Sequence, residues 1–431
     1  MDHRGNSPTE RDAMLKYLGI GSEGQLYDHV NEKMLLHREL AVDGGLSEID
    51  LTRMMRELAA TNRPVTRFLG AGMYKHFVPA AVRHVTGLPQ FSTSYTPYQA
   101  EASQGVLQAL YEYQTMICRL TGMDVSNAGL YDGSTALAEA CLMAKRISRK
   151  SQVIIPDNLH PEYVKVLSTY LASCMMSATI MKTTGGVIDE GILGNKITDD
   201  TACVIVQNPN FTGCIEDTER IADIVHDNSC LQVACVNDAT SLGLIKPPKD
   251  SDIVVGEGQS LGNDVAFGGP HFGFMATRKE YVRKMPGRLV GGTVDDRGQR
   301  GYVLTIQSRE QHIRREKATS NICTSESLNA IAATAYLSLL GPHGLRDVAL
   351  ASHHNTCYLR DRLLSIKGFT QVYDKPFYNE VLIRGPEGVD TGAGYDLSRV
   401  DGSLRGEVLY CCTELDTKER IDEFIREVKA R

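Results

Sequence analysis

The sequence has no excess of positive charge and no long apolar run, and each absence removes a class of protein. Its 431 residues carry a net charge of −7 at pH 7. Nucleic-acid binders need clustered positive charge, so we expect no nucleic-acid partner. No stretch approaches the roughly 18 consecutive apolar residues of a membrane helix, and the charged opening segment 1–18 lacks the apolar core of a signal peptide. We therefore expect a cytoplasmic protein that does not associate with a membrane.

The sequence also lacks a Cys-x-x-Cys pair. Its 11 cysteines include several inside apolar runs, such as Cys203 and Cys235, which is typical of buried reduced thiols. The other candidate metal ligands are Cys230 with Cys235, the Cys411–Cys412 pair and the His353–His354 pair. Because none of these has zinc-finger spacing, we expect no metal site.

Short apolar runs alternate with helical patterns through the middle of the chain. The runs that predict strands are 152–155, 202–206, 231–236 and 252–255. Continuous apolar runs suit strands covered on both faces, as in a mostly parallel sheet with helices on both sides. Before these runs, Ser47–Asp50 matches a capping box that starts a predicted helix, and a second helix is expected over 102–120 before Gly122. The predicted fold class is α/β.

The pattern changes after Gly268. Two extended runs, 272–277 and 301–306, predict edge strands or a hairpin, and a long helix is expected over 325–340. Later strands are expected over 380–384 and 407–412. We therefore expect three parts, which are an N-terminal helical segment (1–66), a large α/β domain (67–324), and a helix with a small C-terminal α+β domain (325–431).

The first candidate site is Tyr131–Thr135, where a turn of small residues enters a predicted helix. Gly133, Ser134 and Thr135 would present backbone N–H groups at the positive end of the helix dipole, which suits a phosphate group. An ordinary N-cap is the alternative interpretation, because Ser and Thr are common at helix starts. The motif alone does not decide between the two.

The second candidate is Asp238, just after the apolar run 231–236. Fold-type I enzymes place an Asp there to pair with the ring nitrogen of pyridoxal phosphate, and an ordinary turn Asp is the alternative. Such an enzyme also needs a lysine just beyond the next strand, but Gly256–Gly262 contains none. Lys246 and Lys249 lie earlier, in a loop that we expect to be exposed.

The third candidate combines two segments. Tyr95–Gln99 is a turn that carries Tyr95 and Tyr98 around a proline, and Arg314–Thr324 is a basic run that ends in small hydroxyl residues. Capped, solvated loops are the alternative for both segments, and residue propensities do not separate the two interpretations.

Ordered segments along nearly the whole chain match the motifs of one enzyme family. The early segments are Phe68–Gly72, Tyr95–Gln99, Tyr111–Thr115 and Tyr131–Gly133. The later segments are Phe267–Pro270, Met285–Gly291, Arg309–Arg315 and Lys317–Thr324. Together they resemble the P protein of the glycine cleavage system. Long matches in a conserved order are far more specific than any single Gly-rich loop.

The resemblance implies the type I pyridoxal-phosphate-dependent transferase fold, which is aspartate aminotransferase-like. Some organisms split this protein into two homologous subunits, and the cofactor lysine belongs to the second, in a His-Lys pair after an Asp-Ile-Val-like strand. In this chain Asp252–Val254 is followed by Gln259–Ser260 at the matching place. The chain therefore resembles the first, alpha-type subunit. The resemblance implies no covalently bound cofactor on this chain and pyridoxal phosphate on the beta-type partner subunit.

The reaction that the resemblance implies is the decarboxylation of glycine, with transfer of the aminomethyl group to the lipoyl arm of the H protein. The residues that we expect to serve the partner's site are Tyr95 and Tyr98 at the substrate end, and Thr319, Ser320 and Asn321 at the cofactor phosphate. The residues that we expect to form a vestigial cofactor pocket in this chain are Gly133, Ser134, Thr135 and Asp238.

Two other functions stay open at this point. The chain could be a stand-alone pyridoxal-phosphate enzyme that uses a lysine outside the expected place. It could also be a non-catalytic scaffold that stabilises the partner or docks the H protein. For any obligate heteromer of this kind, we expect a large apolar surface that the partner covers.

Overall fold

The computed structural model describes residues 5–62, 67–318, 320, 322, 325–386 and 392–430. They belong to two compact units that divide at residue 65. The N-terminal unit contains the helices α1 (Pro8–Leu18) and α2 (Glu48–Ala60) and the short 3-10 helices η1 (Glu23–Tyr27) and η2 (Glu32–Met34). None of its described residues is buried. The helix predicted from the Ser47 cap is confirmed as α2, since the Ser47 hydroxyl accepts a hydrogen bond from the Asp50 N–H.

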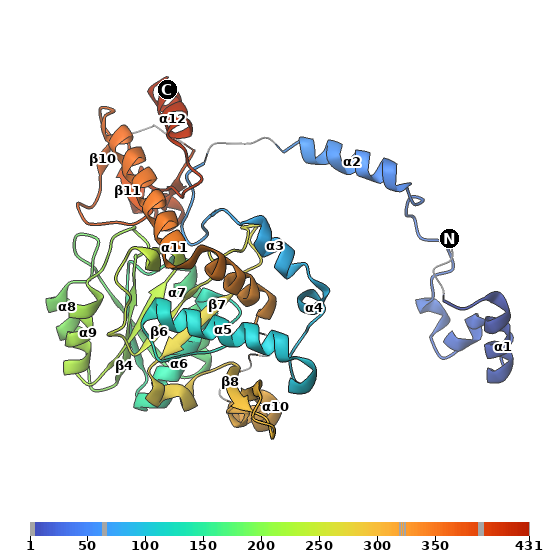
Figure 1. Cartoon of the computed structure of the whole chain (residues 1–431). Helices are drawn as coiled ribbons and strands as arrows, with labels where there is room; N and C mark the ends of the chain where they lie inside the picture. The colour runs from blue at the N-terminus through green and yellow to red at the C-terminus, as the bar shows by residue number, and fades with distance from the viewer. Residues whose placement is uncertain are drawn as a thin grey trace. The chain divides into compact units, whose positions relative to one another are not determined.

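The second unit is built on a seven-stranded sheet with the order β1-β7-β6-β5-β4-β2-β3. Figure 1 labels β4, β6 and β7 of this sheet. The strands are β1 (Val125–Ser126), β2 (Gln152–Pro156), β3 (Ser177–Met181), β4 (Thr201–Gln207), β5 (Leu231–Val236), β6 (Ile253–Glu257) and β7 (Gly273–Thr277). Neighbours among β2 to β6 are parallel, whereas β7 is antiparallel to both β6 and β1. The four apolar runs predicted as strands are confirmed as β2, β4, β5 and β6.

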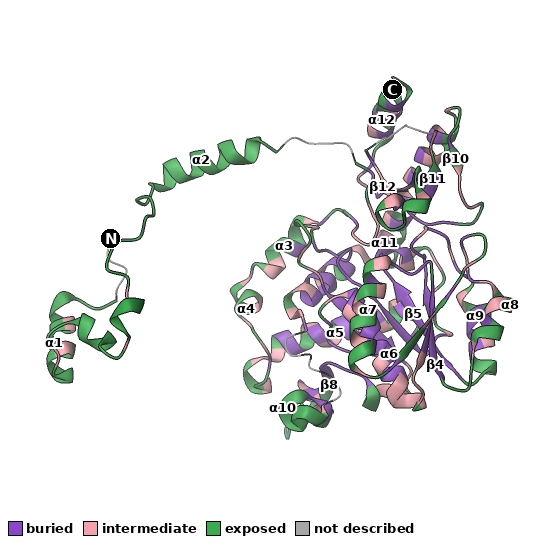
Figure 2. Cartoon of the chain, turned by 180° about the vertical axis from the view of Figure 1, so that it is seen from behind, coloured by how far each residue is buried: buried purple, intermediate pink, exposed green. Residues whose placement is uncertain are grey.

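Helices cover both faces of this sheet. They are α5 (Gln104–Thr121), α6 (Gly133–Ser148), α7 (Pro161–Ser173), α8 (Glu190–Lys196) and α9 (Thr218–Asp227). Consecutive side chains of β6 point to opposite sides, so Val254 joins the core cluster under α5 and Val255 joins the cluster under α6 and α7. Figure 2 shows the buried strands between these helices. Each fully buried aliphatic side chain contributes about 1.5–3 kcal/mol, which explains why the predicted strands are apolar throughout.

The C-terminal part begins with α11 (Ser327–Leu364), which bends at Gly341 before Pro342. It leads to a four-stranded antiparallel sheet and then to α12 (Lys418–Ala430). The strands, in the sheet order, are β10 (Thr370–Gln371), β11 (Glu380–Arg384), β13 (Glu407–Cys411) and β12 (Tyr395–Asp396). The strands predicted over 380–384 and 407–412 are thus confirmed. A domain boundary between residues 324 and 325 stays a prediction.

The prediction of a hairpin or edge strands for 272–277 and 301–306 is wrong in its pairing. The first run forms β7, which lies between β6 and β1 and is buried along its whole length. The second run forms β9 (Arg300–Thr305), which pairs with β8 (Leu289–Val294) in a separate two-stranded sheet. Local pattern identified both strands but not their partners.

None of the described helices has both the length and the hydrophobicity that spanning a bilayer requires. The described parts of the chain also contain no group of three or more His, Cys, Asp or Glu side chains placed to hold a metal ion.

Candidate functional site

Two of the candidate motifs meet beyond the carboxyl ends of the parallel strands of the large sheet, which form one edge of that sheet. Asp238 lies two residues beyond β5, and Glu257 is the last residue of β6. The two strands pair in parallel with Val236 opposite Gly256, so both carboxylates lie at the same edge. The N-terminus of α6 joins them there, because the N–H of Gly133 donates to Glu257 Oε2 at 3.0 Å.

Carboxylates occupy the N-terminus of α6. Asp132 is the N-cap, and its Oδ1 accepts from the Thr135 N–H at 2.7 Å and from the Ser134 hydroxyl at 2.8 Å. Glu257 accepts from Gly133, and it also accepts from the Gln259 N–H at 3.0 Å. The backbone donors that a phosphate would use therefore already have negatively charged partners.

Asp238 is 2% exposed, and protein groups bind both of its oxygens. Oδ1 accepts from the N–H of Thr240 at 3.0 Å and from its hydroxyl at 2.6 Å. Oδ2 accepts from Asn379 Nδ2 at 2.7 Å and lies 3.1 Å from His76 Nε2. The other ring nitrogen of His76 lies 2.7 Å from Glu414 Oε2.

The electrostatics of this buried cluster favour a charged histidine. Burial alone would lower the pKa of His76, but Asp238 and Glu414 outweigh it and raise that pKa to about 10. Burial likewise tends to raise the pKa of Asp238, and the charge and hydrogen bond of His76 reverse the effect and lower it. The cluster is therefore an imidazolium held between two carboxylates.

The place expected for a cofactor lysine is closely packed. Ser260 is 1% exposed and accepts a hydrogen bond from the Ala239 N–H at 3.1 Å. A Cβ on Gly258 would lie 2.1 Å from the ring of Phe272. Lys246 and Lys249 are exposed, as predicted, and Lys246 forms an ion pair with Glu219.

The described residues at this edge do not fit pyridoxal phosphate. The carboxylate that would face the ring nitrogen is bound by His76, and the helix N-terminus that would face the phosphate is bound by Glu257. The segment Gly256–Gly262 has no amine to form the covalent bond.

A cavity of about 620 Å³ brings parts of the first and third motifs together. Thr135 at the start of α6 and Ser320 both line it, with Tyr131, Arg315 and Glu139. Burial raises the pKa of Glu139 to about 7, against the opposing charge of Arg146. Thr319 and Asn321, which the sequence also singled out, lie outside the described residues.

A second, strongly basic cavity involves the same segment. Its volume is about 290 Å³, and the residues that line it are Arg146, Arg283, Lys284, Ile306, Ser308, Arg309, Arg314 and Lys317. Hydrogen bonds fix the side chain of Arg309, and one of them runs from its Nη2 to the carbonyl oxygen of Gly287 at 3.0 Å. Among the described residues, six cations and no carboxylate line this cavity, so it favours an anion.

Tyr98 and Tyr95 do not line the cavity that contains Ser320. Tyr98 is half-exposed, and its phenol oxygen accepts from Arg288 Nη2 at 3.1 Å. The guanidinium of Arg288 also lies over the Tyr98 ring, 5.1 Å from its centroid, and the His312 ring meets the Tyr98 ring edge-on. Tyr95 is 74% exposed.

Comparison with known proteins identifies the family. A family model described as "Glycine cleavage system P-protein" matches residues 1–428. The chain belongs to this family. A P-protein relative from Desulforamulus reducens, "Probable glycine dehydrogenase (decarboxylating) subunit 1", is 45% identical over 428 residues, which are 96% of each chain.

Solved structures agree with this family assignment. The crystal structure of a glycine decarboxylase (P-protein) in inhibitor-bound form has 40% identity and a TM-score of 0.91, and the match covers 100% of both chains. A glutamate decarboxylase from Lactobacillus brevis, at 12% identity, matches 94% of this chain and 96% of its own with a TM-score of 0.65, which shows a shared fold. The predicted type I pyridoxal-phosphate-dependent fold is therefore confirmed.

Sequence reasoning missed His76 in this P-protein chain. The residue lies in the loop after Phe68–Gly72, a segment that the family resemblance had marked, yet nothing local indicates that it would bind Asp238, 162 positions away. The basic cavity was also missed, because Arg146 and Arg309 come from separate parts of the chain.

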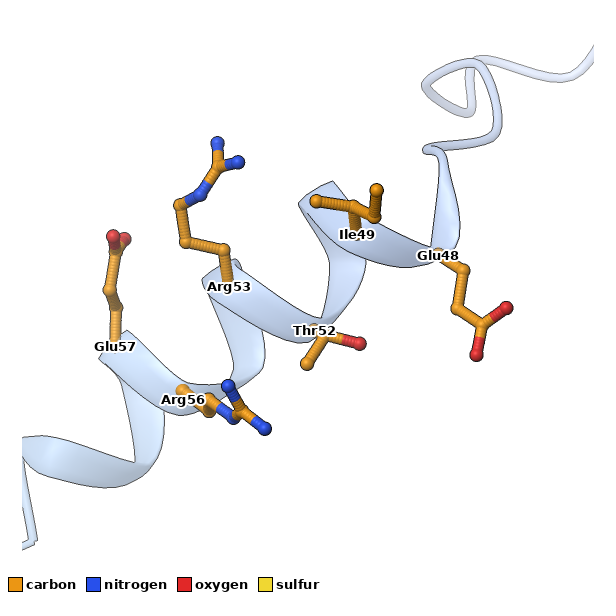
Figure 3. A pocket seen from close by; sticks show the side chains of 6 residues that line it. All are labelled: Glu48, Ile49, Thr52, Arg53, Arg56 and Glu57. Carbon is orange, nitrogen blue, oxygen red and sulfur yellow. The ribbon is translucent and has the colours of Figure 1, made fainter.

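One further hollow, of about 490 Å³, lies along α2 of the P-protein chain. Figure 3 shows its lining side chains, and all of them come from that one helix. Its lining residues are Glu48, Ile49, Thr52, Arg53, Arg56 and Glu57. A single exposed helix does not enclose a ligand, so this hollow is not a candidate active site.

Proposed function

We propose that this chain is the lysine-less, alpha-type subunit of a two-subunit cytoplasmic glycine decarboxylase. Its proposed partners are a beta-type P-protein subunit that carries pyridoxal phosphate and the lipoylated H protein, which receives the aminomethyl group from glycine. Relatives named as subunit 1 support this proposal. The observation that carries it is the closely packed cluster after β5 and β6, where a serine, Ser260, lies at the place expected for the lysine and His76 binds Asp238.

The chemistry divides between the subunits in this proposal. Decarboxylation of an amino acid needs an electron sink, which pyridoxal phosphate supplies and protein side chains do not. This chain would then act by binding and orienting groups at the partner's site. Its exposed lysines give no support to a stand-alone pyridoxal-phosphate enzyme.

We assign the contact with the partner's cofactor phosphate to Thr319, Ser320 and Asn321. Ser320 is half-buried in a cavity that Arg315 also lines, and Arg314 and Lys317 line the neighbouring basic cavity. Hydroxyl donors close to fixed positive charges suit a phosphate dianion, because charge-assisted hydrogen bonds are stronger than neutral ones. Support for this assignment comes from Ser320 and from Arg315 in the same cavity, which Glu139, Glu316 and Glu326 also line.

We assign the substrate end of the site to Tyr95 and Tyr98. The contact with Arg288 fixes the Tyr98 phenol and adds positive charge next to it. A phenol near a guanidinium suits the carboxylate of glycine or the polar end of the lipoyl arm. Tyr95 is exposed and within three residues of Tyr98, so a partner or an arm could reach it.

Exposed apolar side chains support a partner that covers this chain. Phe267 is fully exposed, Tyr131 is 66% exposed and Ile313 is 53% exposed. In the N-terminal unit, Ile49 is 73% exposed and Leu58 is 60% exposed. Obligate interfaces are rich in such side chains and often bury more than about 2,000 Å².

Borohydride reduction tests where the cofactor is bound. The chain is co-expressed with a lysine-bearing partner, the complex is reduced, and pyridoxyl-lysine is located by mass spectrometry. We expect the label on the partner and none on this chain. A pyridoxyl group on Lys246, or on any other lysine of this chain, would refute the proposal and favour a stand-alone enzyme.

A further inference from the structure

Two side chains bind the groups with which a pyridoxal-phosphate enzyme of this fold is expected to hold the two ends of its cofactor, since His76 contacts Asp238 and Glu257 accepts from Gly133 at the start of α6. The ring cation of that cofactor pairs with an Asp at the end of a strand, and its phosphate dianion suits a helix N-terminus. We infer that His76 and Glu257 are an internal substitute for the cofactor, with the His76 imidazolium in place of the ring cation and the Glu257 carboxylate in place of the phosphate.

His76 matches the ring cation in chemistry and contacts. It is a flat aromatic ring with a protonated nitrogen, its side chain is 2% exposed, and that nitrogen lies 3.1 Å from Asp238 Oδ2. The second ring nitrogen lies 2.7 Å from Glu414 Oε2. Removing the ring would leave two carboxylates close together in a buried site without their cation, which is strongly unfavourable.

Glu257 matches the phosphate in the donors that it binds. It is 3% exposed and accepts from three backbone N–H groups, those of Gly133 at 3.0 Å, Gln259 at 3.0 Å and Phe272 at 3.3 Å. His271 Nδ1 lies 3.3 Å from the same carboxylate, and the proximity of Glu257 raises the pKa of this histidine. A buried carboxylate that accepts from three backbone N–H groups, one of them at the start of α6, binds donors of the kind that a phosphate site uses.

The His76 cluster also connects the large sheet to the C-terminal part. Asp238 follows β5, whereas Glu414 follows β13 and Asn379 precedes β11. The hydroxyl of Thr240 lies 3.0 Å from the hydroxyl of Tyr378, which extends the contact. A cofactor bound at this place would contact the same two parts. In its absence, His76 holds the large sheet and the C-terminal part together through Asp238 and Glu414.

The cationic half is tested by chemical rescue of His76→Ala. Amide hydrogen exchange is followed by mass spectrometry in peptides that cover residues 72–79 and 236–244, on the full chain purified alone or with any partner that accompanies it. We expect faster exchange in this variant and partial restoration by millimolar imidazole. The matched control is His84→Ala, whose side chain is exposed on α3 (Ala80–Thr86), and it should show neither effect. Unchanged exchange in His76→Ala, or no response to imidazole, would overturn the assignment.

A second variant keeps the test decisive if His76→Ala does not fold. The double variant His76→Ala/Asp238→Asn neutralises one of the two carboxylates that lose their cation. We expect it to be soluble and not to respond to imidazole. If the double variant is as insoluble as the single one, charge pairing is not the role of His76 and the inference is wrong.

The anionic half is tested with Glu257→Ala and inorganic phosphate. We expect phosphate to slow amide exchange in a peptide that covers residues 131–136 in this variant. It should have no such effect on the parent or on Glu162→Ala, which removes an exposed carboxylate of α7. Equal responses in all three proteins would overturn the assignment of Glu257. None of these measurements uses catalysis, so their failure would leave the proposed function standing.

Discussion

His76 gives the chain a distinctive dependence on pH. The folded chain raises the pKa of this histidine from its ordinary value of 6.5 to about 10. A group with a raised pKa stabilises the fold fully below its unfolded pKa, and the contribution is lost as pH rises through the folded pKa. The loss therefore falls between pH 6.5 and about 10.

The size of the effect follows from the same values. At about 1.4 kcal/mol per pH unit, the rise from 6.5 to about 10 corresponds to roughly 5 kcal/mol. Breaking a buried ion pair typically costs about 3–5 kcal/mol, which is the same order. We therefore expect the free energy of unfolding to fall by several kcal/mol across this range.

The assay compares the parent with His76→Gln, which retains hydrogen bonding but cannot become charged. Urea unfolding midpoints are measured from about pH 6 to pH 10 in both proteins, and equal slopes of the transitions make the midpoints comparable. The parent should be more stable at low pH and approach the variant at high pH. Groups that lie away from Asp238 and Glu414 titrate alike in both proteins and cancel in the difference. A difference that stays constant with pH would show that His76 is neutral in the folded chain and refute the reasoning.

Two substitutions test the proposed contribution to a partner's site in the reconstituted complex. Ser320→Ala should weaken retention of pyridoxal phosphate by about 1 kcal/mol, the cost of one hydrogen bond, and cofactor release on dilution measures it. Ser168→Ala on the exposed side of α7 should retain cofactor like the parent, and equal retention by Ser320→Ala would contradict the contact. Tyr95→Phe should slow glycine–carbon dioxide exchange while cofactor retention stays normal. Tyr17→Phe, at a side chain 91% exposed, serves as its control, and a normal exchange rate in Tyr95→Phe would remove that residue from the site.

The sequence was most informative where burial is continuous along one segment. β4 and β5 are buried over their whole lengths, so their apolar runs identified them. β3 was missed because Ser177–Met181 is mostly exposed at the sheet edge and carries a mixed pattern. The helix expected over 325–340 exists but extends to Leu364 beyond a bend at Gly341, where Gly and Pro together resemble a stop signal.

Site chemistry was predictable only within single segments. Asp238 could be selected as a candidate because a carboxylate after a buried strand is a local feature, and the absence of lysine from Gly256–Gly262 can be read directly from the sequence. His76 was not found, because its pairing with Asp238 and Glu414 depends on packing between the N-terminal side of this unit and its C-terminal part. The pairing of strands far apart in sequence, such as β7 with β1, was not predicted for the same reason.

The measurement that tests the central claim most directly is glycine–carbon dioxide exchange with H protein present, on this chain alone, on a lysine-bearing partner alone, and on mixtures of the two. Because Ser260 stands where the cofactor lysine is expected, this chain alone should be inactive. The partner alone should be inactive or nearly so, and the rate should rise with added chain until the two are matched. Full activity of the partner alone would make this chain a scaffold, and activity of this chain alone would contradict the account altogether.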